Sequence, residues 1–281
     1  SDTLGAMNRA ATKHCYEENI MDAREVGRLW EENAEAWTQL SRAGYDVTRD
    51  RYNTPTFLSL LPEVKGLKGL DLGCGEGHNT RMVAKRGAVM TALDIAPTFV
   101  RYANNHESQA SLGIRYLIAS GTEIPFADES FDFIVAFMSL MDMFNHELAV
   151  QESYRTLKPG GFFQFSIIHP LFDGANRFWV RDETGNKIAL ACRDYFDDGE
   201  HMEEWIFHTA PPELKAKYRP FKTAYFTRTL SSWLNLFAEA GFILESAAEP
   251  HADAKTIELY PEEAKSCIAP FFLITRWRKP M

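Results

Sequence analysis

The feature that most limits the fold of this chain is a glycine-rich segment at residues 69–80, GLDLGCGEGHNT. Gly73, Gly75 and Gly77 stand between a short apolar run and a helical pattern over about residues 78–86. Glycines at such a turn let the backbone approach a ligand, and the free N–H groups at the start of a helix attract an anion. The segment therefore predicts a ligand crevice at the end of a β-strand.

Apolar runs and helical patterns alternate along the sequence on both sides of this loop. The expected strands are 69–72, 89–93, 114–119, 131–137, 162–168, 242–247 and 270–277. The expected helices include 21–43, 78–86, 97–107, 146–157 and 229–239. Such alternation is typical of βαβ units with helices on both faces of a sheet. It predicts an α/β fold of the Rossmann-like, doubly wound type, with a mostly parallel seven-stranded sheet.

Four segments follow from these patterns. We expect an N-terminal helical lid over 1–60, a cofactor-binding core over 61–168, an inserted cap or substrate subdomain after the fifth strand over 169–227, and a completion of the core sheet over 228–281. The inserted segment is rich in aromatic and acidic residues and has no long helical period. In open α/β sheets the ligand binds beyond the carboxyl ends of the strands, so both the lid and the cap are placed to cover it.

An acidic residue follows the next strand, as a ribose-binding site requires. Asp94 stands 21 residues after Gly73, at the end of the predicted strand 89–93. A carboxylate there can accept two hydrogen bonds from a ribose diol. A dinucleotide site also wants a third glycine, but His78 occupies that position. A nucleotide-containing ligand is indicated, and a nucleotide-cofactor oxidoreductase is the less favoured alternative.

Composition excludes several classes of function. The net charge of −9 argues against a nucleic-acid-binding surface, and the longest uncharged apolar stretch, 133–141, is too short to span a membrane. No secretion signal is recognised, so we expect a cytoplasmic protein. No metal site is expected, because His201, His208 and His251 match no metal-binding spacing. The cysteines form no CxxC pair, which excludes a zinc ribbon; they are Cys15, Cys74, Cys192 and Cys267.

Four motifs in order resemble those of one large enzyme superfamily. DLGCGEG (71–77), ALDIAP (92–97), IPFADESFDFIVA (124–136) and LKPGG (157–161) resemble the class I S-adenosylmethionine-dependent methyltransferases, in their small-molecule branch. The resemblance implies S-adenosylmethionine as cofactor and S-adenosylhomocysteine as product. It implies methyl transfer to an O, N or C atom of a small molecule by in-line displacement. An RNA methyltransferase and a non-enzymatic S-adenosylmethionine-binding protein remain as alternatives.

The same resemblance implies a set of cofactor-binding residues. Asp71 and the glycine loop would hold the amino-acid end, Asp94 the ribose, and Ile95 the adenine ring. Ser120 stands where the family usually has an acid, which weakens the expected contact with the adenine amino group. The full set is Asp71, Gly73, Cys74, Gly75, Gly77, Asn79, Asp94, Ile95, Ser120, Gly121, Thr122, Phe137 and Met138.

The acceptor side is predicted from position alone. His169 follows the fifth strand and Asp142 follows the fourth, so these two are the candidates for a catalytic base, while His146 is expected at the surface. Aromatic residues of the lid and cap suit a flat, apolar pocket. The predicted substrate residues are Trp37, Tyr45, Met141, Phe172, Trp179 and Trp205. We expect a small-molecule methyl acceptor as partner, no nucleic acid and no membrane; a homodimer is compatible with the sequence.

Overall fold

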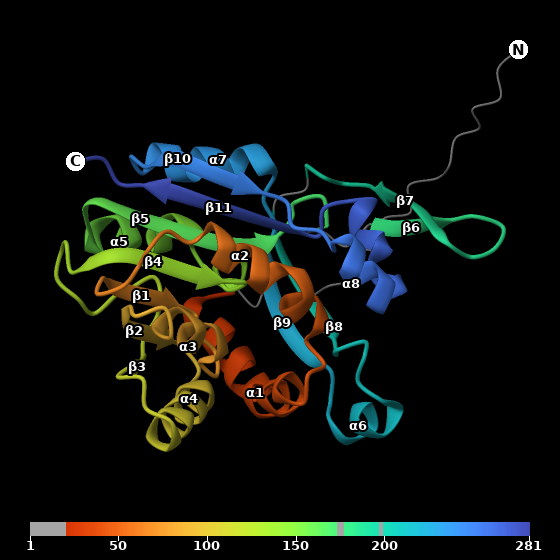
Figure 1. The fold of residues 1–281 in the computed structure, drawn as a ribbon, viewed down its shortest axis with the longest axis horizontal. Coiled ribbons are helices and arrows are strands. Elements are labelled where there is room, and N and C mark those ends of the chain that lie inside the picture. The colour runs from red at the N-terminus through yellow and green to blue at the C-terminus, as the bar shows by residue number, and fades with distance from the viewer. Residues whose placement is uncertain (1–20, 173–176, 197–198) are drawn as a thin grey trace, which may run out of the picture.

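The computed structural model describes residues 21–172, 177–196 and 199–281 (Figure 1). The part of the expected N-terminal lid before residue 21, with Cys15, lies outside this range. A single seven-stranded sheet runs through the molecule in the order β10-β11-β5-β4-β1-β2-β3. All its pairings are parallel except those of β11, which is antiparallel to β5 and to β10. The predicted Rossmann-like α/β fold with a mostly parallel seven-stranded sheet is confirmed.

The element bounds are close to those expected from the sequence pattern. The sheet strands are β1 (Lys68–Leu72), β2 (Val89–Asp94), β3 (Arg115–Ile118), β4 (Phe131–Phe137), β5 (Leu157–Ile168), β10 (Ile243–Ala248) and β11 (Phe272–Arg278). The α-helices are α1 (Ala23–Arg42), α2 (Thr54–Leu60), α3 (His78–Ala84), α4 (Pro97–Gln109), α5 (His146–Thr156), α6 (Pro212–Lys217), α7 (Leu230–Glu239) and α8 (Ala254–Leu259). Shorter helical turns are η1 (Arg49–Asn53), η2 (Leu140–Asp142) and η3 (Pro261–Cys267).

The strand order reverses between β1 and β4. β1 pairs with β2 on one side and with β4 on the other. From β1 the chain adds β2 and β3 toward one edge of the sheet, and then β4 and β5 toward the other edge. Loops that follow neighbouring strands diverge at such a point and leave a crevice at the carboxyl edge of the sheet. The glycine loop follows β1, so it lies at this crevice.

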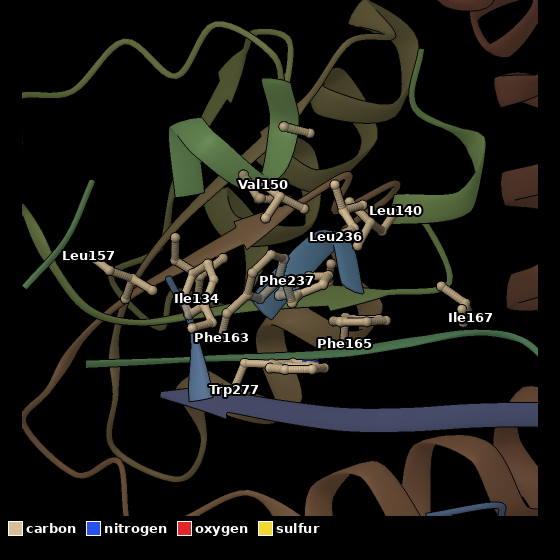
Figure 2. Packing of buried hydrophobic residues seen from close by; sticks show 14 of the residues in the cluster. Ile134, Leu140, Val150, Leu157, Phe163, Phe165, Ile167, Leu236, Phe237 and Trp277 are labelled. Atoms are coloured by element: carbon tan, nitrogen blue, oxygen red, sulfur yellow. The ribbon is translucent and has the colours of Figure 1, made fainter. Parts of the chain in front are cut away.

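One face of the sheet packs against Ala149 and Val150 of α5 and against aromatic rings of α7 (Figure 2). Phe163 and Phe165 alternate along β5 toward this face, as the two-residue period of a strand requires. The ring of Phe237 stacks on Phe165 at 4.8 Å and on Trp277 at 5.1 Å between centroids. Stacked pairs of this kind contribute about 0.5–1.5 kcal/mol beyond the burial of their area. This core holds β4, β5 and β11 in register, and with them the strand ends that reach the crevice.

The other face packs against α2, α3 and α4. Phe57 of α2, Val83 of α3 and Val100 of α4 lie in one buried cluster with Phe133 of β4. A polar residue also points to this side: the side-chain amide of Gln164 donates to the Phe57 carbonyl at 2.7 Å. That hydrogen bond satisfies a backbone group near the end of α2 that would otherwise be buried without a partner. The helices therefore cover both faces of the sheet, as the alternation in sequence predicts.

The segment between β5 and α7 forms two separate two-stranded sheets. β6 (Arg177–Arg181) pairs with β7 (Lys187–Cys192), and β8 (Glu200–Trp205) pairs with β9 (Phe221–Phe226). Figure 1 shows β6 and β7 near α8, while β8 and β9 run toward α1. Within the residues that the structure describes, the expected insertion over 169–227 thus contains two separate two-stranded sheets.

Helix α1 joins the insertion to the core. The buried amide of Asn33 donates to the Lys222 carbonyl of β9 at 2.8 Å and accepts from the Lys222 N–H at 3.2 Å. On its other side, Glu31 accepts from the N–H of Thr98 at 2.9 Å and from its hydroxyl at 2.8 Å. A carboxylate at the first turn of α4 satisfies free N–H groups and favours the helix dipole. These contacts fix α1 across the carboxyl edge of the sheet.

Two details differ from the sequence expectation. The Pro159–Gly161 turn lies within β5, which begins at Leu157, because the backbone of Gly160 continues into a pairing with Lys279. His146 is buried rather than exposed: its Nδ1 accepts from Arg228 at 2.9 Å, and its ring packs on Trp233. Burial and the Arg228 charge lower the pKa of His146 to about 4. Within the described ranges, no helix has both the length and the apolar character needed to cross a bilayer.

Candidate active site

A cavity of about 800 Å³ opens at the carboxyl edge of the sheet, where β1 and β4 diverge. Its walls come from the glycine loop, the ends of β2 and β4, helix α1, and the insertion after β5. Most of the residues predicted for cofactor, substrate and catalysis line it together, whereas Asp71, Gly75, Gly77 and His169 do not. Those that line it are Trp37, Tyr45, Gly73, Cys74, Asn79, Asp94, Ile95, Ser120, Gly121, Thr122, Phe137, Met138, Met141, Asp142, Phe172, Trp179 and Trp205.

The glycine loop adopts a conformation that only glycine accepts without strain. Gly73, Gly75 and Gly77 have φ values of 70°, 55° and 86°. A Cβ on Gly73 would lie 2.4 Å from the Cβ of Ser139, and one on Gly77 would lie 2.6 Å from the hydroxyl of Tyr116. Gly75 has no neighbour within 4 Å of such an atom. Two of the three glycines are therefore required by close packing as well as by φ, and the third by φ alone.

Asp94 lies at the end of β2 against this loop. Its carboxylate accepts from the N–H of Gly75 at 2.8 Å and from the N–H of Ala96 at 2.9 Å. Burial raises the pKa of Asp94 to about 6, while these two hydrogen bonds oppose the rise. Each carboxylate oxygen has a second lone pair, so both can accept a further hydrogen bond from a ligand hydroxyl. The pair of oxygens at the cavity wall fits a ribose diol.

Asp71 is buried beneath the loop and does not line the cavity. One carboxylate oxygen accepts from the Thr80 hydroxyl at 2.5 Å, and the other has no hydrogen-bond partner among the described residues. Burial raises the pKa of Asp71 to about 7, and the charge of Asp94 contributes in the same direction. A buried carboxylate with a free oxygen favours a cation nearby. Because Asp71 lies outside the cavity wall, any role at the amino-acid end of the cofactor would be indirect, and that role stays a prediction.

The expected adenine side of the cavity lies beneath helix α1. A Cβ on Gly27 of α1 would lie 3.1 Å from the side chain of Ile95, so the helix backbone rests directly on this residue. Ser120 and Thr122 form a small turn, with their hydroxyl oxygens 2.7 Å apart and the Thr122 N–H donating to Ser120 at 3.2 Å. Phe99 of α4 adds an aromatic wall that the sequence analysis missed. Ile95 and Phe99 thus form a flat apolar slot, with the hydroxyl groups of Ser120 and Thr122 at one end.

The end of β4 supplies the middle of the cavity. Met138 has a φ of 53°, which is rare for a residue other than glycine, and its N–H donates to the Ser166 carbonyl at 2.9 Å. Backbone strain of this kind persists at ligand sites because the surrounding structure holds it in place. The turn η2 then brings Met141 and Asp142 into the wall. Of the two predicted bases, Asp142 is the one that reaches the cavity.

The far wall is aromatic and comes from two distant parts of the chain. Trp37 of α1 meets Trp205, Phe207 and Phe221 of the insertion with ring centroids 5.3, 5.0 and 5.0 Å apart. Phe172 and Trp179 lie on another side, 5.7 Å apart. Rings packed edge to face leave flat surfaces for an apolar ligand. The insertion and α1 thus form one wall, although Trp37 and Trp205 are 168 residues apart in the sequence.

His169 is placed differently from its prediction. It does not appear among the cavity-lining residues, and its side chain is largely buried. Its Nδ1 accepts from the N–H of Leu171 at 3.1 Å, and its Nε2 lies 3.0 Å from a carboxylate oxygen of Glu249. An imidazole whose Nδ1 lone pair is occupied cannot take a proton there, and Nε2 faces away toward Glu249. The position of His169 therefore does not support a role as catalytic base.

Several cavity residues had no signal in the motifs. Tyr52, Ser139, Met143, Lys187 and Lys265 all line the cavity. Ser139 holds the glycine loop by donating to the Leu72 carbonyl. Phe99 lies just after the second motif, and Ser139 lies just after the fourth strand. Their positions next to strand ends could have identified them as cavity residues. The others lie in segments outside every motif, and nothing in the sequence pattern points to them.

Comparisons with known proteins agree with this geometry. A methyltransferase domain family matches residues 70–165. An uncharacterized protein of Haemophilus influenzae is 25% identical over 205 residues, which cover 70% of this chain and 75% of that protein. A demethylmenaquinone methyltransferase of Tropheryma whipplei is 29% identical over 137 residues, covering 49% of this chain and 56% of that protein. The chain thus spans little more than half the length of that curated enzyme.

Solved structures give the same result for a longer part of the chain. An S-adenosylmethionine-dependent methyltransferase from Mesorhizobium loti superposes with a TM-score of 0.67 at 26% identity, over 80% of this chain and 96% of its own. The glycine loop and Asp94, with its free carboxylate lone pairs, lie within the residues 70–165 that the methyltransferase domain family matches. The comparisons confirm the resemblance to the class I S-adenosylmethionine-dependent methyltransferases, and S-adenosylmethionine is the cofactor that they support.

Proposed function

We propose that this methyltransferase transfers its methyl group to an O, N or C atom of a small, mainly apolar molecule enclosed between α1 and the insertion. The observation that carries the proposal is one continuous cavity of about 800 Å³, which joins Asp94 and the glycine loop to an aromatic wall. Small-molecule sites range over about 300–1,000 Å³. A cavity near the top of that range suits a cofactor and a small acceptor side by side, and not a macromolecular surface.

The bound cofactor supplies a methyl group already activated by a sulfonium centre, so the protein needs little covalent chemistry of its own. Its residues have three tasks. Asp94 and the glycine loop fix the donor on one side of the carboxyl edge. The rings of Trp37, Trp205 and Phe172 orient the acceptor and exclude water. Holding the reacting atoms about 3–3.5 Å apart in line is the main source of rate acceleration in such a displacement.

An acceptor that begins protonated also needs a base, and Asp142 is the candidate. It lies in the wall where β4 ends, next to Met141. A carboxylate can accept the proton of a hydroxyl or ammonium group within hydrogen-bond reach. For an acceptor whose attacking atom carries a free lone pair, positioning is sufficient and Asp142 acts only on orientation.

The proposal is tested by methyl transfer from labelled cofactor. The protein is incubated with methyl-tritiated S-adenosylmethionine and fractions of a small-molecule extract, and products are separated by mass. We expect an acceptor that gains 14 mass units and whose labelling is lost with Asp94→Ala. Calorimetry that shows cofactor binding, combined with no labelled product in any fraction, would instead support a non-enzymatic binding protein. Binding of NADH in place of S-adenosylmethionine would revive the oxidoreductase alternative.

A further inference from the structure

The end of the cavity that lies away from the glycine loop carries basic side chains from separate segments. Lys187 of β7 and Arg177 of β6 line it together with Lys265 of η3. In the β6–β7 hairpin, Arg177, Trp179 and Lys187 share one face, and the Lys187 ammonium lies 4.7 Å from the centroid of the Trp179 ring. The opposite face of the same hairpin is solvent-exposed. The hairpin thus turns its aromatic and cationic face toward the cavity.

The positive charge at this end is only partly compensated. Lys265 lies 3.7 Å from Glu263, but Glu263 is fully buried and its other oxygen pairs with Arg51 at 2.5 Å. Burial lowers the pKa of Lys187, and the charges of Lys265 and Arg181 lower it further, while Glu263 acts in the opposite direction. Arg51 also pairs with Glu262 at 2.8 Å, so two carboxylates face Arg51, Lys265 and Lys187, and the like charges of the two lysines lie near one another at the cavity wall.

The opposite end of the cavity differs in this respect. There Arg49 lies 3.2 Å from Asp46 and 2.8 Å from Asp50, and Glu76 lies 2.8 Å from Arg42. Those charges are paired with each other within the protein. The other carboxylates in the wall are Asp94, Asp142 and Glu203. An uneven distribution of this kind, in a chain with a net charge of −9, gives a local attraction for an anion that the surface as a whole would repel.

A buried hydroxyl at the same end has no partner. Tyr52 lines the cavity, is 3% exposed, and its hydroxyl makes no hydrogen bond to any residue that the structure describes. Its ring is held against Phe272 with centroids 5.5 Å apart, so the hydroxyl cannot turn out to water. A buried donor without a partner destabilises the folded protein. A ligand oxygen at this position would remove that cost.

We propose that the methyl acceptor carries an anionic group, such as a carboxylate, sulfonate or phosphate, which lies against Lys187, Lys265 and the hydroxyl of Tyr52, a class assignment that rests on the proposed function. The apolar body of the acceptor lies along Phe172 and Trp179, toward the end of β4. The two lysines supply charge and the phenol supplies a directed donor. The acceptor is therefore an amphiphilic acid, oriented with its charged end away from the cofactor.

The test uses two fluorescent probes with the same apolar body. 8-Anilinonaphthalene-1-sulfonate and N-phenyl-1-naphthylamine differ by the sulfonate group, and both become fluorescent in an apolar site. Each is titrated into the wild-type protein saturated with S-adenosylhomocysteine. We expect the sulfonate to bind about fivefold more tightly than the neutral probe, and the difference to shrink as salt is raised. Equal affinity for the two probes would overturn the proposal.

Substitutions then place the anion. Lys187→Met and Lys265→Met should each weaken the sulfonate by about threefold to fivefold and leave the neutral probe within about twofold. Tyr52→Phe keeps the ring packing and should weaken binding of the sulfonate probe alone. This variant tests the site independently of any folding defect in the lysine variants. Lys255→Met is the matched control, because Lys255 is an exposed residue of α8 that does not line the cavity. A loss of the same size with Lys255→Met would show a general charge effect and contradict the assignment.

Failure of this inference is distinguishable from failure of the proposed function. Calorimetry with S-adenosylmethionine is run on the same wild-type preparation. Cofactor binding without a sulfonate preference removes only the anionic acceptor, and the methyltransferase proposal stands. Absence of cofactor binding removes the proposed function, whatever the probes do.

Discussion

The two ends of the cavity are formed by different chemical groups, mainly backbone at one end and side chains at the other. The cofactor end uses backbone N–H groups, three glycines with positive φ and the buried carboxylate of Asp94, all held by the central strands. The acceptor end uses side chains, mainly aromatic rings and lysines, from α1, the insertion and η3. Backbone geometry at a strand end allows few sequences, whereas a ring or an ammonium group can come from almost any segment. Under the proposed function, this difference explains why the glycine-loop end resembles a large superfamily while the aromatic end would select the acceptor.

The largest effect is expected at the glycine loop. Gly73→Ala should lower the free energy of unfolding by about 3 kcal/mol or more, because the new Cβ meets Ser139 at 2.4 Å and φ is 70°. Gly75→Ala is the matched control, since it shares the positive φ but has no neighbour within 4 Å, and should cost about 1 kcal/mol. Urea denaturation of the two variants measures the difference. Equal losses would show that close packing plays no part at Gly73.

The next effect concerns Asp94. Asp94→Asn should weaken S-adenosylmethionine by about 1–3 kcal/mol, because a charge-assisted acceptor for the ribose is lost. The pKa of Asp94 is raised to about 6 by burial, so the carboxylate is charged above that pH and protonated below it. Wild-type affinity should therefore fall as the pH drops through about 6, and the variant should show no such fall. Calorimetry between pH 5 and 8 gives both results.

Two further variants separate the sources of that pH dependence. Asp142→Asn changes a carboxylate in the cavity wall that is not expected to touch the ribose, and it should keep the wild-type profile. Asp71→Asn tests the second buried carboxylate, whose pKa is raised to about 7. A profile that survives in Asp94→Asn and disappears in Asp71→Asn would transfer the effect to the amino-acid end of the cofactor.

A smaller and more selective effect is expected at the acceptor end. Trp37→Leu should raise the KM for the acceptor by about tenfold, since the ring contacts with Trp205 and Phe207 orient that wall. Affinity for S-adenosylmethionine should stay within about threefold. Phe178→Leu is the control, because Phe178 is 53% exposed on the outer face of the β6–β7 hairpin. If cofactor and acceptor affinity fall together in Trp37→Leu, the two ends are not separable.

The same contrast decides what could be predicted from the sequence. The alternation of apolar runs and helical patterns predicted all seven strands of the sheet, and each glycine of the loop has a positive φ. These features have local causes: the two-residue and 3.6-residue periods, and the steric limits on φ. Asp94 is placed by its distance from the loop along one βαβ unit, which is also a local constraint.

The acceptor end lacks such local causes. Tyr52, Lys187 and Lys265 meet only because three segments far apart in the sequence fold onto one edge of the sheet. Neither periodicity nor spacing reports that meeting, and a lysine in an acidic chain is normally a solvated surface residue. His146 was misplaced for the same reason: its burial depends on Arg228 and Trp233, which lie more than 80 residues away.

The smallest effect on turnover is expected at His169, and it separates position in sequence from position in space. His169→Gln should leave kcat within about threefold, because the ring is directed toward Glu249 and the Leu171 N–H and not into the cavity. Stability should fall by about 1 kcal/mol, since the Leu171 N–H loses its acceptor and the contact with Glu249 changes. Asp142→Asn is compared in the same assay. For an acceptor that must lose a proton, it should lower kcat by about 100-fold. A 100-fold loss of kcat in His169→Gln with unchanged KM and stability would restore the histidine as the base, and would require the loop after β5 to turn toward the cavity when the acceptor binds.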